Sequence, residues 1–183
     1  LSSAASDVYK RQIVIQASMI SNALIELGID ATDTTMLSSG ERVEIQYTIT
    51  NQATRQDSFD LSVDFIEAIG WIIEAEQRPS IVINPGSTAS FYIAVTAPDN
   101  AQANDFAPTF KPILTSTRSG MQYSGPEYSN ILIETLYDVE LLLVDAESVL
   151  KPGAMTVIGV EAINNGNGPT SATMHLVDAP ESW

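Results

Sequence analysis

Strict alternation of apolar and polar residues is the feature that most restricts the fold of this chain. From Asp57 to Phe65 the residues read DSFDLSVDF, so every second position from Phe59 onward is apolar. Successive side chains of a β-strand point to opposite faces, and a period of two therefore buries one face and leaves the other in water. The segment Thr88–Thr96 repeats the pattern, with its inner positions at Ala89, Phe91, Ile93 and Val95.

Shorter apolar runs predict further strands at Ile25–Ile29, Glu41–Thr50, Ile81–Ile83, Phe110–Thr117 and Asn130–Glu134. Asn84-Pro-Gly-Ser87 is a strong turn signal, because proline presets φ and glycine accepts positive φ. Pro112 has no N–H to donate, which predicts an edge or bulged position for its strand. No segment has a sustained helical period. Seven or eight short strands predict an all-β antiparallel sandwich, with an up-and-down barrel as the alternative.

The chain also repeats itself at an offset of 113 residues. At this offset the strand expected at Glu41–Thr50 lies over Ala154–Ile163. The matching landmarks are Gly40 with Gly153, Asn51 with Asn164, and, with one residue of slack, Trp71 with Trp183. A glycine turn, a strand, an asparagine and a tryptophan in the same order indicate tandem copies of one structural unit.

The repeat predicts the domain organisation. Residues 13–19 are interpreted as the last strand of a preceding unit, residues 20–134 as a complete sandwich, and residues 135–183 as the first half of a following unit. Residues 2–12 resemble a translated sequencing-library adapter, so 1–12 is treated as a non-native segment. On this interpretation the sequence is a fragment of a longer repeat protein.

Charge and composition exclude several classes of function. The chain has 23 acidic and 8 basic residues, a formal net charge of −15. Nucleic acids and anionic membranes bind clustered lysine and arginine, so neither is an expected partner. Without cysteine the chain has no disulfide, no thiolate nucleophile and no thiolate metal ligand. No apolar run reaches the roughly 18 residues of a membrane span.

The order of glycine turns, strands, asparagine and tryptophan is similar to a known family. The motifs are GERVEIQYTITNQA, DSFDLSVDF, GW and SIVINPGSTASFYIAVTAP, with a second copy in KPGAMTVIGVEAINNGNGP. They resemble the prokaryotic immunoglobulin-like domains of extracellular proteins, of the cell-adhesion-related bacterial type and the type attached to some α-galactosidases. The resemblance implies an immunoglobulin-like sandwich and an extracellular or cell-surface location. Gln52-Ala53 stands where the pattern has glycine, so we expect the first copy to form a different turn there.

Few residues are candidates for chemistry. His175 is the only histidine, and alternation with Met174 and Leu176 predicts that it points away from the core. With no second histidine and no cysteine, a transition-metal site has almost no ligands to use, and a Ser-His-Asp triad would need its histidine to come from an incomplete unit. Trp71 and Trp183 are candidates for stacking on sugars. Their equivalent positions in both copies favour packing on the core instead.

Carboxylates give the remaining candidate site. The oxygen ligands of a calcium ion at a repeat junction would come from Asp30, Asp33, Glu41, Asp99 and Asp105. Calcium needs six to eight converging oxygens, and no EF-hand spacing is present, so a solvated acidic surface is the simpler interpretation. The long segment Ala97–Pro108 has no phosphate-binding glycines and is interpreted as a crossover between sheets.

These patterns predict no catalytic, cofactor-binding or metal-binding residue, and therefore a fragment that is not an enzyme. The expected function is a structural spacer of a large secreted or cell-surface protein, with neighbouring immunoglobulin-like repeats of the same chain as partners. The alternatives are a glycan- or protein-binding adhesion module and an accessory domain of a secreted glycoside hydrolase. An exposed aromatic cluster or apolar patch would favour binding.

Overall fold

A computed structural model describes residues 21–145, 153, 155 and 157–175. The expectations for residues 1–19, Leu176 and Trp183 lie outside these residues. All regular structure in the described ranges consists of β-strands. No helix in these ranges is long and apolar enough to cross a membrane. The strands are β1 (Ala23–Leu27), β2 (Thr35–Leu37), β3 (Arg42–Asn51), β4 (Asp57–Phe65), β5 (Ile72–Ala75), β6 (Ile81–Ile83), β7 (Thr88–Thr96), β8 (Phe110–Ser116), β9 (Gln122–Ser124), β10 (Ile131–Ile133), β11 (Val139–Asp145) and β12 (Gly159–Asn164).

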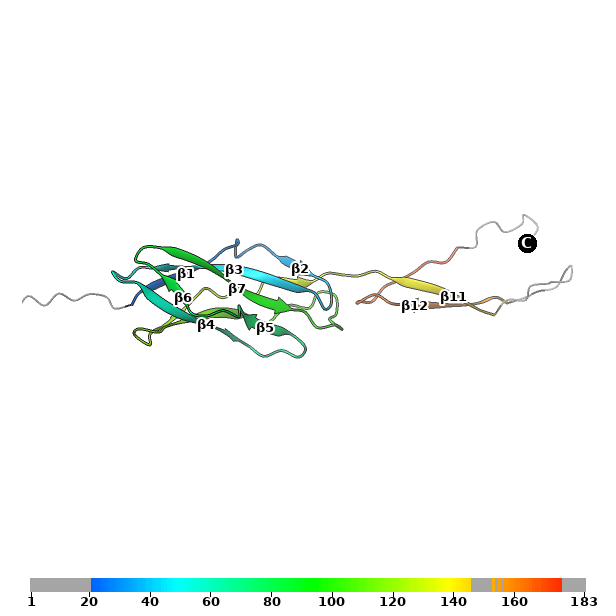
Figure 1. The fold of residues 1–183 in the computed structure, drawn as a ribbon. Helices are drawn as coiled ribbons and strands as arrows, with labels where there is room; N and C mark the ends of the chain where they lie inside the picture. Colours follow the sequence, from blue (N-terminus) through cyan, green and yellow to red (C-terminus); the bar gives the residue numbers. More distant parts are fainter. Residues whose placement is uncertain (1–20, 146–152, 154, 156, 176–183) are drawn as a thin grey trace, which may run out of the picture.

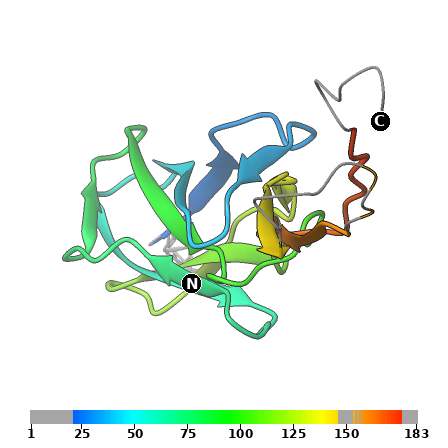
Figure 2. The same ribbon diagram turned by 90° about the vertical axis from the view of Figure 1, so that its right-hand side faces the viewer.

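Two four-stranded antiparallel sheets form the body of the molecule. One has the strand order β1-β3-β7-β5, the other β6-β4-β8-β9, and they stack face to face (Figures 1 and 2). The predicted immunoglobulin-like β-sandwich is confirmed, and the barrel alternative is wrong because the sheets stay separate. All ten strands from β1 to β10 lie inside the range 20–134 expected for the complete unit.

The core lies between the inner faces of the two sheets. In the long ladder between β3 and β7, Tyr47 pairs with Phe91 and their rings stack with centroids 5.7 Å apart. Both side chains are fully buried, as is Phe59 from β4 on the opposite sheet. Burial raises the pKa of the Tyr47 phenol. The alternation predicted for β3 and β7 is therefore the alternation that builds the core.

Strand β8 is a central strand, so the edge position predicted from Pro112 is wrong. It pairs with β4 on one side, where Val63 faces Pro112, and with β9 on the other. The carbonyl of Pro112 accepts a hydrogen bond from the Gly125 N–H at 2.9 Å. Since N–H and C=O of one residue point to the same side of an antiparallel strand, the N–H that proline lacks belongs to the side away from β4. The ladder to β4 therefore loses no donor.

A parallel pair closes one side of the sandwich. Strand β10 runs alongside β2, with Ile131 opposite Thr35 and Ile133 opposite Leu37. Ile131, Ile133 and Leu37 are buried, so this short pair belongs to the core rather than to the surface. The chain leaves β10 at the end of the sandwich beyond which β11 and β12 lie (Figure 1).

The remaining strands form a hairpin whose register matches that of the first pair of the sandwich. The β11–β12 ladder begins with Val139 opposite Asn164, as the β1–β3 ladder begins with Ala23 opposite Asn51. Four further pairs follow in step until Leu143 faces Val160, which corresponds to Leu27 facing Tyr47. The hairpin lies beyond one end of the sandwich in Figure 1.

Candidate functional site

Asn51 is a fully buried polar residue at the end of β3, and its side chain holds the corner to β4 together. The side-chain amide Nδ2 donates to the carbonyls of Arg55 and Ile83, both at 2.9 Å. Its Oδ1 accepts from the Ala53 N–H at 2.9 Å. A buried amide must find such partners, because an unpaired polar group inside a protein is costly. We call this arrangement the Asn51 corner.

Asn164 makes the same local bonds at the end of β12. Its Oδ1 accepts from the N–H two residues on, that of Gly166, at 3.1 Å. Its Nδ2 donates to the carbonyl four residues on, that of Gly168, at 2.8 Å. The expectation that the two copies form different turns is therefore wrong. Gly166 does not adopt positive φ, so Ala53 fits the equivalent place without strain.

The glycine that precedes the strand has the same kind of backbone conformation in both copies. Gly40 has φ of 74° and Gly153 has φ of 80°, both in the left-handed region that favours glycine. The turn at Ser38–Gly40 closes when the Glu41 N–H donates to the Ser38 carbonyl at 3.1 Å.

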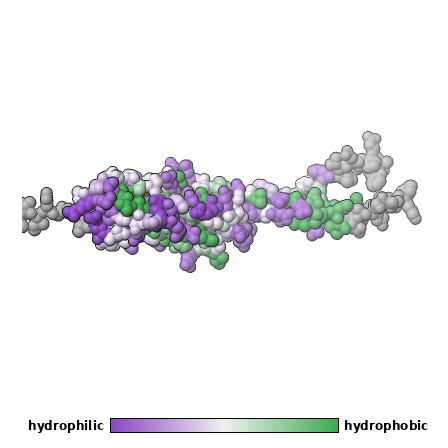
Figure 3. All heavy atoms as spheres, viewed as in Figure 1, coloured by the Kyte–Doolittle hydropathy of each residue, from purple (hydrophilic) through white to green (hydrophobic). Residues whose placement is uncertain are grey.

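The hairpin carries an open apolar groove of about 590 Å³. It is lined by Val139, Leu141, Ile158, Val160, Ala172, Thr173, Met174 and His175. Figure 3 shows this apolar surface in green over the hairpin. Three of its residues correspond to core residues of the sandwich, Leu141 and Val160 by strand register and Ile158 by the sequence offset of 113. Leu141, Ile158 and Val160 are 54%, 53% and 43% exposed, whereas the matching Ile25, Ile45 and Tyr47 are 8%, 2% and 0% exposed.

His175 and Met174 both line this groove. Residues 171–175 are not in a strand, so the alternation from which the direction of His175 was predicted is not present there. His175 is exposed. No group of three potential metal-ligating side chains forms around it or elsewhere in the described part of the chain.

Trp71 directly precedes β5, is half-buried and packs against the core, as predicted from its place in the repeat. The loop before it is apolar at its tip. Ile66 is 71% exposed and Ile69 fully exposed, on a turn closed by a bond from the Trp71 N–H to the Ala68 carbonyl at 3.3 Å. Gly70 takes φ of 81° and lies so close to Pro98 that a Cβ would meet the proline Cβ at 2.9 Å. We call residues 66–71 the apolar tip.

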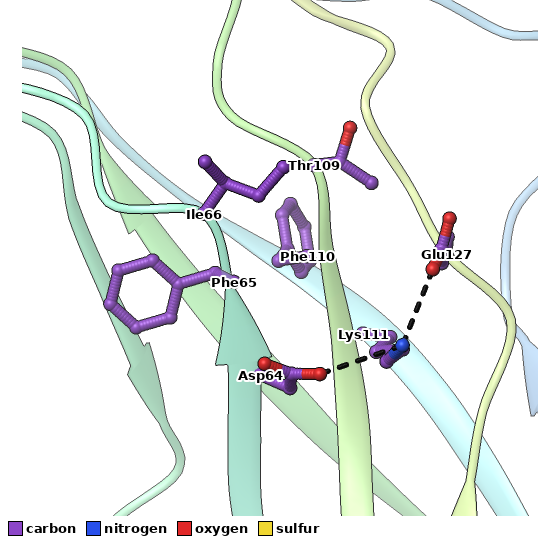
Figure 4. Close-up of a pocket in the computed structure, with 7 residues that line it drawn as sticks. All are labelled: Asp64, Phe65, Ile66, Thr109, Phe110, Lys111 and Glu127. Carbon is purple, nitrogen blue, oxygen red and sulfur yellow. Dashed lines mark hydrogen bonds and ion pairs between the residues drawn. The ribbon is translucent and has the colours of Figure 1, made fainter.

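A small hollow of about 220 Å³ beside the apolar tip is shown in Figure 4. Lys111 lies at its edge, 3.5 Å from an oxygen of Asp64 and 3.3 Å from one of Glu127. Hydrogen bonds to Glu127 and then to Asp64 raise the pKa of the lysine. Small-molecule sites usually enclose about 300–1,000 Å³, so this open hollow is too small to enclose such a ligand.

The carboxylates considered as calcium ligands lie in or beside separate local turns instead. Asp30 accepts from the N–H and hydroxyl of Thr32 at 2.9 and 2.7 Å, and these bonds lower the pKa of Asp30. Glu41 accepts from the Ser38 N–H at 2.8 Å, and Asp105 from the Gln102 N–H at 3.0 Å. Asp99 lies over Gly40, and Asp33 belongs to the turn of Asp30. No three carboxylates come together in the residues that the structure describes.

Two features were missed at the sequence level. The apolar tip was readable as FIEAIGW, in which two isoleucines precede a glycine. The second feature is the buried pair Asp57 and Ser116, whose carboxylate Oδ2 and hydroxyl are 2.8 Å apart. No sequence signal marks this pair, because its members are 59 residues apart.

Comparisons with known proteins assign neither a family nor a function to the chain. No protein-family model matches the chain, and a comparison with curated protein sequences finds no match. A FixG-related protein from Vibrio parahaemolyticus is 16% identical, with a TM-score of 0.40, over 61% of this chain and 97% of that one. Alpha-2-macroglobulin from Escherichia coli is 12% identical, with a TM-score of 0.44, over 69% of this chain and 20% of that one.

A third similar structure is a family 123 glycoside hydrolase from Clostridium perfringens, 12% identical with a TM-score of 0.42. The match covers 62% of this chain and 27% of that one, so this chain spans only a minor part of the macroglobulin and the hydrolase. At these similarities none of the three assigns a function. The specific family type expected from the sequence stays a prediction.

The corners at Asn51 and Asn164 allow a matched pair of predictions about the stability of the sandwich. Asn51→Ala leaves two carbonyls and one N–H without partners in a buried place, so the sandwich should lose about 2–4 kcal/mol of unfolding free energy. Asn51→Asp keeps the acceptor but loses both donors, and it should also destabilise. Asn164→Ala, at an exposed corner, should leave the denaturant transition of the sandwich unchanged. Equal losses for Asn51→Ala and Asn164→Ala would contradict the account.

Proposed function

We propose that the chain is a non-catalytic spacer built of tandem immunoglobulin-like units, from a secreted or cell-surface protein. The observation that carries the proposal is the repeated corner. Asn51 and Asn164 make the same bonds to residues two and four positions on, and the strands leading into them pair in the same register. Agreement of sequence, register and side-chain bonding at one offset is the signature of a repeated structural unit.

The apolar groove of the hairpin supports the same interpretation. Its strand residues correspond to the inner face of the sandwich, where they form the core. An apolar surface on that face is what a unit of this plan presents toward its second sheet. The groove is therefore better explained as half of a sandwich core than as a ligand site, although its volume of about 590 Å³ is within the range of small-molecule sites.

A spacer gains length with each unit, and the hairpin extends the sandwich end to end (Figure 1). Small-angle X-ray scattering should show this by comparing residues 21–183 with residues 21–134. Seven residues of β-strand span about 23 Å, so the largest dimension should grow by about 20 Å or more. An unchanged largest dimension would mean that the second unit folds back beside the first, and would contradict a spacer role.

Binding of a glycan or protein is the second candidate, and the apolar tip favours it. Ile69 projects fully into solvent, and exposed apolar side chains grouped at one loop end mark binding sites in many proteins. At the offset that aligns the two tryptophans, Ile69 corresponds to Glu181 in the second copy. The tryptophan is thus shared by both copies, whereas the tip residue differs. An accessory role beside a secreted glycoside hydrolase would use such a tip in the same way.

A direct binding test separates the two candidates. The spacer proposal predicts that the chain retains no ligand on an array of glycans, and that Ile69→Ser changes neither retention nor stability, because the Ile69 side chain is fully exposed. Retention that Ile69→Ser abolishes while the denaturant midpoint stays the same would establish the binding role instead.

A further inference from the structure

The turn that follows Asn164 contacts the linker between the two units. The side chain of Asn167 brackets Thr135, because Nδ2 donates to the Glu134 carbonyl and Oδ1 accepts from the Leu136 N–H, both at 2.8 Å. The Asn167 N–H donates to the Leu136 carbonyl at 3.3 Å. One side chain therefore holds the backbone on both sides of a single linker residue.

The near end of the linker is fixed to the sandwich. The Glu134 N–H donates to the Leu37 carbonyl at 2.9 Å, and the Glu134 carboxylate accepts from the Ser38 hydroxyl at 2.6 Å. The far end is fixed to the hairpin, where the Asn165 N–H donates to the Asp138 carbonyl at 2.8 Å. Only residues 135–137 lie between these fixed ends, and Asn167 bonds to Leu136 among them and to Glu134 at the near end.

The same turn also reaches the long segment 97–108 of the first unit. The Ala103 N–H donates to the Asn167 carbonyl at 2.9 Å, and Gly168 is so close that a Cβ there would meet the Ala103 Cβ at 3.0 Å. The segment itself is held on β10, because the Asn104 N–H donates to the Ile133 carbonyl at 3.0 Å. It is therefore more than a crossover between sheets, since it offers a rigid backbone donor to the next unit.

The corner formed by Asn164 does not require an asparagine at position 167. In the first unit the corresponding residues are Gln52, Ala53, Thr54 and Arg55, and Asn51 forms its corner with Thr54 in the place of Asn167. The asparagine at 167 is thus not needed for the corner, and its side-chain bonds all go to the linker. Gly166 and Gly168 provide the close approach that larger residues would prevent.

We infer that residues 165–168 and the segment 97–108 form an inter-unit lock that fixes the orientation of the two units, with Asn167 as its positioning residue. The partner of segment 97–108 is a following unit of the same kind that carries an Asn-Gly-Asn-Gly turn. This inference rests on the proposed spacer function and adds that the spacer is stiff at this junction. A flexible spacer would need neither the bracketed linker nor the contact to Ala103.

Distance measurements between spin labels test the lock in the full chain. Because the chain has no cysteine, Val82→Cys on β6 and Glu161→Cys on β12 place two labels at exposed positions, one in each unit. The parent chain should give one narrow distance distribution. Asn167→Ala should broaden it and speed amide exchange at Ala103 about tenfold, as expected for the loss of one hydrogen-bonded contact.

Two further variants make the test specific. Gly166→Ala introduces alanine, the residue that the first unit has at the equivalent position, Ala53. Its Cβ would overlap the Leu136 carbonyl oxygen, so this variant should broaden the distribution as well. Glu140→Ala removes a side chain on β11 that bonds the Asn165 side chain and no linker residue, and it should change nothing. A broad distribution in the parent chain, or no effect of Asn167→Ala, would overturn the lock. An elongated scattering profile with a broad distribution would retain the spacer and reject only the lock.

Discussion

The ladder between β3 and β7 is the element on which the rest of the sandwich depends. Its inner face presents Ile45, Tyr47, Phe91 and Ile93, all at most 2% exposed, to the opposite sheet. Burying large apolar side chains of this kind contributes about 1.5–3 kcal/mol each, more than any surface ion pair of the chain can supply. The remaining strands extend this ladder or cover its inner face, and the position of every loop follows from them.

The same ladder explains why a polar side chain can be buried at its end. Asn51 completes β3 where the chain must turn toward the other sheet, and the turn leaves backbone groups that no ladder satisfies. A single asparagine satisfies two of them and also the carbonyl of Ile83 at the end of β6. The hairpin keeps the two local bonds of this arrangement at Asn164. A repeated unit needs the same turn at the same place in each copy. The asparagine at this turn is therefore more specific evidence that the hairpin corresponds to the first strands of the sandwich than the apolar residues are.

Much of the fold could be predicted because long strands carry their own signal. Alternation over β4 and β7 placed their inner faces correctly, and the Asn84–Ser87 turn forms with Gly86 at φ of 69°. Strands β2, β5 and β9 have three or four residues, too few for a period to show. Pro112 was misplaced because the cost of a missing N–H depends on which neighbour that N–H would face, a property of the ladder and not of the residue.

The functional features were less predictable because they depend on contacts between residues that are far apart in the sequence. The Asn167 side chain bonds the linker some thirty residues earlier in the chain, and the Ala103 N–H is sixty-four positions away from the carbonyl it meets. Such contacts exist only once both units are placed. The repeat offset, in contrast, was visible in the sequence. Because of this offset, the groove of the hairpin is interpreted as the inner face of a sandwich.

The most direct test of the central claim is the unfolding of residues 21–134 alone. This piece contains both sheets and one tryptophan, Trp71, which is packed against the core and reports on it. We predict a single cooperative denaturant transition, coincident by tryptophan fluorescence and circular dichroism, with the same midpoint as the sandwich in the full chain. A gradual transition, or fluorescence and dichroism curves that separate, would contradict the claim that these residues form one complete unit.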